Sequence, residues 1–384
     1  RGAEGIIRPR GGIMSGQDYA RLFEPGAIAG MTLANRYVVA PMARISADEN
    51  GVPGADMRDY YAAFAGGGFG LIIAEGTYTD LASSQCFPTQ PGIANQAQID
   101  GWRRVTDAVH EAGGKILLQL MHTGALLTNN TFGAPPLAPS AVLPQGGKPP
   151  RFGGSGAYAV PEELSRDGIQ VIIDSHGEAA ANAISAGFDG AEVHNANGYL
   201  LDEFLTDYTN LRDDDFGGNL ESRLRLPTEI MQAVKSAVGG GVAGVRLSQS
   251  KVNNFEHEWP GGADDARAIF AAEAKAGADY IHLATRRGGA EVFGVGRSLA
   301  GLARDVTGLP VIACGNLEAP DQALDILVRG DGDFAAVAKG AVGDPALPNK
   351  IAAGETPRPF APEMLMPIAT LESTNQWMAA NEAG

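Results

Sequence analysis

Three side chains that can donate hydrogen bonds lie close together at His194, Asn197 and Tyr199. They follow the apolar run 190–193, which reads as a buried strand. A carbonyl oxygen held between His194 and Asn197 would meet two fixed donors, an arrangement that stabilises developing negative charge. Tyr199 is suited to giving a proton to a carbanion, because the ordinary pKa of tyrosine is about 10. These residues predict reduction of an activated alkene, in which the carbonyl is polarised, hydride reaches Cβ and a proton reaches Cα.

Such a reaction requires a redox cofactor, because no side chain supplies hydride. A phosphate site is predicted near Gly315-Asn316 and Lys339-Gly340, where glycine permits close backbone approach and the lysine adds positive charge. This site indicates a phosphorylated cofactor or substrate. Each polar residue also has a structural explanation when taken singly, since His194 alone is more often a core histidine and Arg246 could be part of a structural ion pair.

The elements that must position these residues alternate along the chain. Eight apolar runs are the strand candidates, at 37–40, 71–74, 115–120, 190–193, 242–247, 280–283, 310–313 and 334–338. Helices are predicted at 97–112, 167–186, 222–238, 264–276 and 320–329. The pattern predicts the α/β class with a single (β/α)8 TIM barrel over residues 21–355 and active residues at the C-terminal strand ends. A doubly wound sheet is the alternative, although no GxGxxG follows the first strand.

Four segments fall outside this alternation. Residues 21–36 predict a hairpin with its turn at Pro25-Gly26, placed to close the barrel bottom. The segment 124–160 is rich in glycine and proline and follows the third strand, so we expect a lid, with disorder as the alternative. Residues 1–20 are interpreted as a leader or an added segment, with Met14 as a candidate natural start. The tail 356–384 is expected to pack on its own barrel or on a neighbouring one.

Composition limits the partners. The net charge of −16 argues against nucleic acid or an anionic membrane, and leaves a small-molecule substrate. The two cysteines, Cys86 and Cys314, form no metal-binding spacing, so no metal is expected. We expect a cytoplasmic protein, because disulfide and signal-peptide patterns are not recognised. A monomer and a homo-oligomer are both open.

The stretch HNANGYLLDEFLTDYTNLRDDDFGGNLESRLRL at 194–226 resembles the His-x-x-Asn-Gly-Tyr signature of the Old Yellow Enzyme family and its continuation. Other stretches resemble the family in the expected order: NRYVVAPMAR (35–44), GLIIAEGTYTD (70–80), LLQLMHTG (117–124), GVRLSQ (244–249), CGNL (314–317) and GDPALPNK (343–350). The resemblance implies a (β/α)8 barrel that holds FMN at its C-terminal mouth. It also implies ping-pong kinetics, with NADPH or NADH as reductant and hydride passing from flavin N5 to the alkene Cβ.

The resemblance assigns roles to individual residues. It implies that the isoalloxazine ring is contacted by Pro41, Met42, Ala43, Gly76, Gln119 and Arg246, and the phosphate by Gly315, Asn316, Lys339 and Gly340. His194 and Asn197 would bind the electron-withdrawing group of an unsaturated carbonyl or nitro compound, and Tyr199 would be the proton donor. Tyr78 and Met121 would line the substrate pocket.

Three residues depart from the family pattern. Ala43 stands where the family usually has Thr or Cys, which implies a flavin that is harder to reduce. Lys339 stands where Arg usually grips the phosphate, which implies weaker FMN retention because lysine is a point charge. Met121 stands where some relatives have Trp, which implies a larger and more adaptable pocket.

Several alternatives remain open at this point. A dedicated biosynthetic reductase or a redox-neutral FMN isomerase would use the same residues. A relative of 2,4-dienoyl-CoA reductases would need an iron–sulfur cluster that two cysteines cannot bind. Two alternatives come from other functional classes. One is a phosphate-binding barrel aldolase or isomerase without flavin, and the other is a non-catalytic flavin-binding protein.

Overall fold

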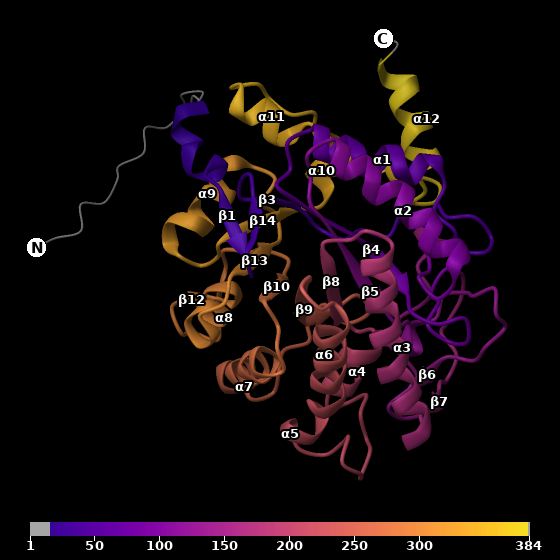
Figure 1. Ribbon diagram of the computed structural model, residues 1–384. Coiled ribbons are helices and arrows are strands. Elements are labelled where there is room, and N and C mark those ends of the chain that lie inside the picture. Colours follow the sequence, from indigo (N-terminus) through magenta and orange to yellow (C-terminus); the bar gives the residue numbers. More distant parts are fainter. Residues whose placement is uncertain (1–15, 383–384) are drawn as a thin grey trace, which may run out of the picture.

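Eight parallel strands form a closed barrel, with helices packed around it (Figure 1). The structure is a computed structural model that describes residues 16–382. The barrel strands are β3 (Tyr37–Val39), β4 (Leu71–Tyr78), β5 (Ile116–Met121), β8 (Gly190–Asn197), β9 (Val242–Lys251), β10 (Tyr280–Ala284), β13 (Val311–Cys314) and β14 (Phe334–Val337). Each pairs in parallel with its neighbours in chain order, and β14 pairs with β3 to close the ring. The predicted (β/α)8 barrel is therefore confirmed.

Twelve α-helices are present in the described residues. They are α1 (Ala55–Gly66), α2 (Gln96–Glu111), α3 (Arg166–Ser185), α4 (Leu200–Leu205), α5 (Leu220–Arg223), α6 (Arg225–Ala237), α7 (Gly262–Lys275), α8 (Leu299–Thr307), α9 (Pro320–Arg329), α10 (Lys339–Gly343), α11 (Leu347–Ala352) and α12 (Leu371–Glu382). Short 3-10 turns lie at Gly16–Phe23, Gly124–Leu126, Pro150–Phe152 and Pro362–Leu365. Three two-stranded sheets lie outside the barrel: β1 (Gly26–Ile28) with β2 (Met31–Leu33), β6 (Leu137–Ala138) with β7 (Glu162–Glu163), and β11 (Glu291–Val292) with β12 (Arg297–Ser298).

The hairpin β1–β2 lies at the closed end of the barrel. Its residues Ile28 and Leu33 are buried in one apolar cluster with the barrel residues Leu71 and Phe334. The predicted turn at Pro25-Gly26 was wrong, because Ile28 pairs with Met31 and the turn therefore lies at Ala29-Gly30. Both turn residues have positive φ, +46° and +86°, as a tight hairpin turn requires.

The predicted helix 222–238 is in fact two helices, α5 and α6, separated at Leu224. Helix α5 begins after Asn219, whose side chain accepts a hydrogen bond from the Ser222 N–H at 2.9 Å. The other predicted helices begin within two residues of the expected position, and α2 and α3 are likewise capped by polar side chains.

Three barrel strands continue beyond the apolar runs that revealed them. The sequence predicted strands 71–74, 190–193 and 242–247, whereas β4, β8 and β9 extend to Tyr78, Asn197 and Lys251. Pairing between β8 and β9 continues through His194 with Arg246, and a register shift follows before Asn197. His194 and Asn197, which were predicted to follow a strand, therefore lie within strand β8.

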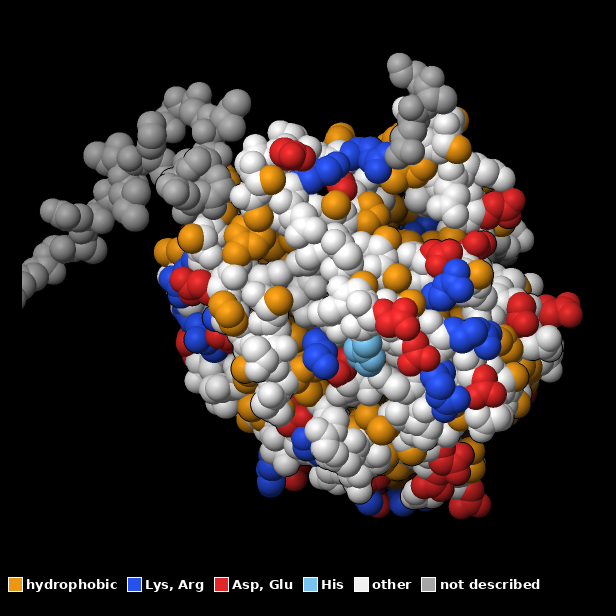
Figure 2. Space-filling model, turned by 45° about the horizontal axis from the view of Figure 1, so that its top comes forward, with side chains coloured by type: hydrophobic (Ala, Val, Ile, Leu, Met, Phe, Trp, Pro, Cys, Tyr) orange, Lys and Arg blue, Asp and Glu red, His pale blue; other side chains and the backbone are white. Residues whose placement is uncertain are grey.

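Acidic and basic side chains are interspersed on the face drawn in Figure 2. Within residues 16–382, helices that combine the length and the apolar character needed to cross a membrane are not found. The C-terminal helix α12 lies against α1, on the same chain (Figure 1).

Candidate active site

The turn that carries Asn197 is fixed by hydrogen bonds to the extension of β9. Asn197 has a φ of +65°, a conformation that Asn tolerates better than most residues. Its N–H donates to Ser248 Oγ at 2.7 Å, and its carbonyl accepts from the Val252 N–H at 3.0 Å. Gly198 follows with a φ of +86°. The spacing from Asn197 to Tyr199 therefore reflects two successive left-handed residues, the second of which favours glycine.

A buried ion pair supports the same turn. The Gly198 N–H donates to Asp202 Oδ2 at 2.7 Å, and the other carboxylate oxygen of Asp202 binds the Lys251 ammonium. Both charged side chains are almost fully buried, with exposed fractions of 0% and 1%. Removing either would leave an uncompensated charge, so the pair holds the turn firmly against β9.

Tyr199 precedes helix α4 and leans toward His194. The two ring centroids lie 5.3 Å apart. Tyr199 packs against an apolar cluster that includes Met121, Cys86 and Phe87. Burial raises the pKa of Tyr199 well above its ordinary value, so the hydroxyl keeps its proton across the physiological range.

His194 and Arg246 face the mouth of the barrel with unpaired nitrogen atoms. They lie in register on β8 and β9. His194 Nδ1 and Arg246 Nε are buried and have no hydrogen-bond partner within the described chain. Burial and the positive charge of Arg246 lower the pKa of His194 to about 3, so its imidazole is neutral. Two buried polar nitrogens without partners are typical of a site shaped for a polar ligand.

The loop after β3 brings Pro41, Met42 and Ala43 to the same mouth. Arg246 Nη1 donates to the Pro41 carbonyl at 3.5 Å. Glu75, within β4, fixes the loop by accepting hydrogen bonds from the backbone N–H groups of Arg44 and Ile45, at 2.8 and 3.1 Å. Burial raises the pKa of Glu75.

Gly76, Gln119 and Met121 form the next part of the wall. A Cβ at Gly76 would lie 2.5 Å from Met121 Sδ, so glycine leaves room for the methionine. Gln119 Nε2 donates to the carboxylate of Glu192 at 2.8 Å, and its Oε1 lies on the side of Gly76. The structure thus brings Gly76, Gln119 and Met121 to one side of the mouth.

A second opening lies at the ends of β13 and β14. A cavity of about 420 Å³ is lined by Thr285, Arg286, Cys314, Gly315, Asn316, Glu318, Ala336, Ala338 and Lys339. Gly315 and Asn316 have φ values of +132° and +53°, and a Cβ at Gly315 would lie 2.3 Å from the Thr285 carbonyl oxygen. Glycine is therefore required there. Gly340 directly follows Lys339 in α10.

The predicted lid, residues 124–160, is ordered over the barrel mouth. A cavity of about 210 Å³ lies between this lid and the barrel, and its walls include Tyr199, Phe87, Phe152 and Tyr158. Phe152 packs on Phe87 with 4.6 Å between ring centroids. Aromatic side chains thus share the cavity wall with polar residues such as Arg151 and Asn253, as is usual for a small-molecule site.

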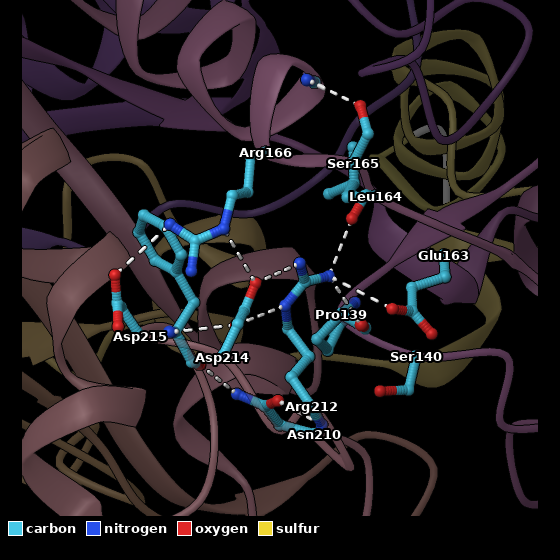
Figure 3. A network of polar contacts seen from close by, with 12 residues as sticks. Pro139, Ser140, Glu163, Leu164, Ser165, Arg166, Asn210, Arg212, Asp214 and Asp215 are labelled. Atoms are coloured by element: carbon cyan, nitrogen blue, oxygen red, sulfur yellow. Dashed lines mark hydrogen bonds and ion pairs between the residues drawn. The ribbon is translucent and has the colours of Figure 1, made fainter.

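Arg212 braces the far end of the lid (Figure 3). Its guanidinium donates to the carbonyls of Pro139 at 3.1 Å and Leu164 at 2.6 Å, and it pairs with Asp214 at 2.7 Å. Arg166 contacts the same aspartate at 3.6 Å. The segment after α4 therefore holds Pro139 within the lid and Leu164 just beyond it.

Tyr78 is held elsewhere. Its hydroxyl donates to the Asn50 carbonyl at 3.2 Å and accepts from Gln98 Nε2 of helix α2 at 2.6 Å. Gly92 leaves room for its ring, since a Cβ there would lie 2.2 Å away. The structure therefore does not bring the Tyr78 hydroxyl to His194 and Tyr199, and a role in the pocket stays a prediction.

The C-terminal segment contributes to the site in a way that the sequence did not indicate. Ile368 packs on the cluster around Tyr199 and Met121. The buried Arg44 guanidinium anchors this segment by donating to Thr370 O at 2.9 Å and Thr374 Oγ1 at 2.6 Å. No local pattern marks Ile368, because its place depends on a contact more than 300 positions away in the chain.

Comparison with known proteins identifies the family of the chain. A family model described as NADH:flavin oxidoreductase / NADH oxidase family matches residues 21–357. A probable flavin mononucleotide-dependent alkene reductase of Leishmania infantum is 40% identical over 62% of this chain and 65% of its own length. The chanoclavine-I aldehyde reductase of Penicillium roqueforti is 35% identical over 89% of this chain and 91% of its own length.

Solved structures of related enzymes have the same fold over most of their length. An Old Yellow Enzyme homologue from Zymomonas mobilis superposes with a TM-score of 0.81 at 30% identity, covering 92% of this chain and 99% of that one. Morphinone reductase in complex with tetrahydroNAD superposes with a TM-score of 0.80 at 29% identity, covering 92% and 96%.

Proposed function

The chain belongs to the NADH:flavin oxidoreductase / NADH oxidase family, and from this premise we propose that it is an FMN-dependent enzyme that uses NAD(P)H to reduce activated alkenes. Its substrates are alkenes conjugated to a carbonyl or nitro group. The observation that carries the proposal is the set of His194, Asn197 and Tyr199 on one strand and turn, beside Arg246 and beneath the lid.

The residues at the barrel mouth fit FMN. Arg246 Nε is a buried donor without a partner, suited to the electron-rich edge of an isoalloxazine ring. The cavity at Gly315 and Asn316 has Lys339 and Arg286 in its walls against a single acid, Glu318, and so favours a phosphate. Bound there, FMN supplies the hydride chemistry that side chains lack.

The chain's own residues prepare the alkene for that hydride. His194, neutral because burial and the charge of Arg246 lower its pKa to about 3, donates one hydrogen bond to the activating oxygen. Asn197 donates the second. These two bonds strengthen as negative charge develops on that oxygen, which lowers the barrier. The Tyr199 hydroxyl then gives its proton to Cα.

One pocket serves both substrates in this proposal. The lid cavity and the barrel mouth meet at Tyr199, so the nicotinamide and the alkene occupy the same place in turn. The cycle is then ping-pong. Anaerobic turnover of NADPH with 2-cyclohexenone tests the proposal. Consumption of one NADPH per cyclohexanone is expected, whereas a redox-neutral isomerase would change the enone without consuming NADPH.

Ala43→Thr is expected to raise the reduction potential of the bound flavin. Ala43 lies half-buried at the barrel mouth and offers no side-chain donor, so a threonine hydroxyl would add one beside the cofactor. The potential is measured by anaerobic titration against a reference dye. Ala43→Val is the matched control, because valine has the shape of threonine without its hydroxyl. An equal potential in the threonine and valine variants would contradict this prediction.

Lys339→Ala is expected to weaken FMN binding about tenfold, since a charge-assisted contact to phosphate is lost at an exposed position. Lys339→Arg should strengthen binding, because a guanidinium can grip two phosphate oxygens. Fluorescence of released FMN reports the dissociation constant. Arg267→Ala serves as control, because Arg267 is exposed on α7 and lines neither this cavity nor the adjoining one at Gly315 and Asn316. Equal binding in all four proteins would show that Lys339 does not hold the phosphate.

A further inference from the structure

A buried carboxylate lies inside the barrel, directly beneath the proposed flavin site. Glu192 on β8 is fully buried and accepts three side-chain hydrogen bonds. Gln119 Nε2 donates to Oε1 at 2.8 Å. The Tyr280 hydroxyl and His282 Nδ1 approach Oε2 at 2.9 and 2.8 Å. The proposed reaction uses neither Glu192 nor its two partners on β10.

Strand β9, which lies between β8 and β10, leaves room for the contact between Tyr280 and Glu192. Gly244 on β9 is in register with both Glu192 and Tyr280. A Cβ at Gly244 would lie 2.0 Å from the Tyr280 ring, so a side chain there would block the tyrosine from crossing to Glu192. Glycine in the middle of a buried strand usually marks such a close approach.

Glu192 is the negative charge beneath Arg246. Burial opposes its ionisation, but the hydrogen bond from His282, the charge of Arg246 and the hydrogen bond from Tyr280 lower the pKa of Glu192 below its ordinary value. Burial lowers the pKa of His282, so its imidazole is neutral and donates through Nδ1. The carboxylate of Glu192 is therefore the negative charge that offsets the guanidinium of Arg246. Arg246 lies in register between His194 and His282.

Glu192 also fixes the orientation of Gln119. Because Gln119 Nε2 points down to the carboxylate, its carbonyl Oε1 faces the side of Gly76, 3.5 Å from the place of a Cβ on that residue. The barrel mouth thus receives an acceptor from Gln119 and not a donor. An acceptor suits the N–H on the pyrimidine edge of an isoalloxazine ring.

We propose that Glu192 is a positioning residue that acts on the flavin through its two neighbours, by offsetting the positive charge of Arg246 and by orienting the Gln119 amide. Its negative charge disfavours the anionic reduced cofactor, and so holds the potential of the enzyme below the value that Arg246 alone would set. The proposal rests on the proposed function only in requiring that FMN binds at the barrel mouth.

Glu192→Gln tests this proposal, with the reduction potential of bound FMN as the readout. The variant removes the charge and keeps the shape. The ratio of affinities for reduced and oxidised FMN should rise about tenfold, which raises the potential by about 30 mV for a two-electron couple. Glu273→Gln is the matched control, because Glu273 on α7 is equally buried but accepts a hydrogen bond from Asn195 Nδ2 at 2.9 Å, outside the barrel interior. Burial raises the pKa of Glu273 to about 7, so both variants are compared above that pH, where Glu273 is ionised.

Tyr280→Phe is expected to shift the flavin potential in the opposite direction. It leaves the carboxylate of Glu192 in place with one hydrogen-bond donor fewer, so the negative charge is less offset and the potential should fall. This variant decides the question if Glu192→Gln does not fold. An unchanged or lowered potential in Glu192→Gln, an equal rise in Glu273→Gln, or a rise in Tyr280→Phe would overturn the proposal. If the unaltered protein did not bind FMN, both this proposal and the proposed function would fail. If it reduced alkenes normally but the variants left the flavin potential unshifted, only the proposal about Glu192 would fail.

Discussion

Tyr199→Phe is expected to slow the reaction of the reduced enzyme with an enone about 10²–10⁴-fold, the usual contribution of a positioned acid. Reduction of the enzyme by NADPH should be unaffected, because that half-reaction needs no proton on Cα. The phenyl ring keeps the contacts of Tyr199 with Met121 and the lid. Stopped-flow absorbance under nitrogen measures the two half-reactions separately.

Tyr158→Phe provides the control for this prediction. Tyr158 is also buried, its hydroxyl pKa is raised by burial to about 12, and it lines the same cavity. It should leave both half-reactions nearly unchanged. Equal slowing in the two variants, or slowing of the NADPH step in Tyr199→Phe, would mean that Tyr199 does not donate the proton.

His194→Phe should lower the rate of enone reduction about 10²–10³-fold, since one of two donors to the developing charge is lost. The imidazole is already neutral, because its pKa lies at about 3. The rate in the unaltered enzyme should therefore show no step from His194 protonation between pH 5 and pH 9, because only the neutral form is populated there.

His194→Asn tests whether the hydrogen bond or the ring matters. An amide N–H restores a donor, so this variant should recover much of the activity lost in His194→Phe. Binding of a substrate-like phenol to the oxidised enzyme, followed through the flavin spectrum, gives a second readout. Equal loss in both variants would indicate that His194 only fills space.

The barrel was predictable because its strands are buried on both faces. Runs such as 71–74 and 310–313 are apolar throughout, and their alternation with helices fixes the parallel order. The candidate residues followed from one rule, that active side chains lie at C-terminal strand ends. Of these residues, His194 and Arg246 lie in register on neighbouring strands, and the Tyr199 ring lies beside that of His194.

Other features were not predictable because they depend on distant pairing. The polar ends of β4, β8 and β9 carry no apolar pattern, yet strand pairing continues through them. Tyr78 belongs to such an end, and contacts from α2 decide where its hydroxyl points. Glu192 did leave a signal, since it interrupts the run Gly190–Val193 with a charge. Only the structure shows the Tyr280 and His282 partners that explain this charge.

Anaerobic reduction of the purified protein with NADPH, followed by addition of 2-cyclohexenone, tests the central claim most directly. The account predicts that the flavin absorption band bleaches with NADPH and returns when the enone is added, with cyclohexanone as product. A band that bleaches but does not return would contradict the proposed alkene reduction. Absence of a flavin band after incubation with FMN would contradict the cofactor assignment itself.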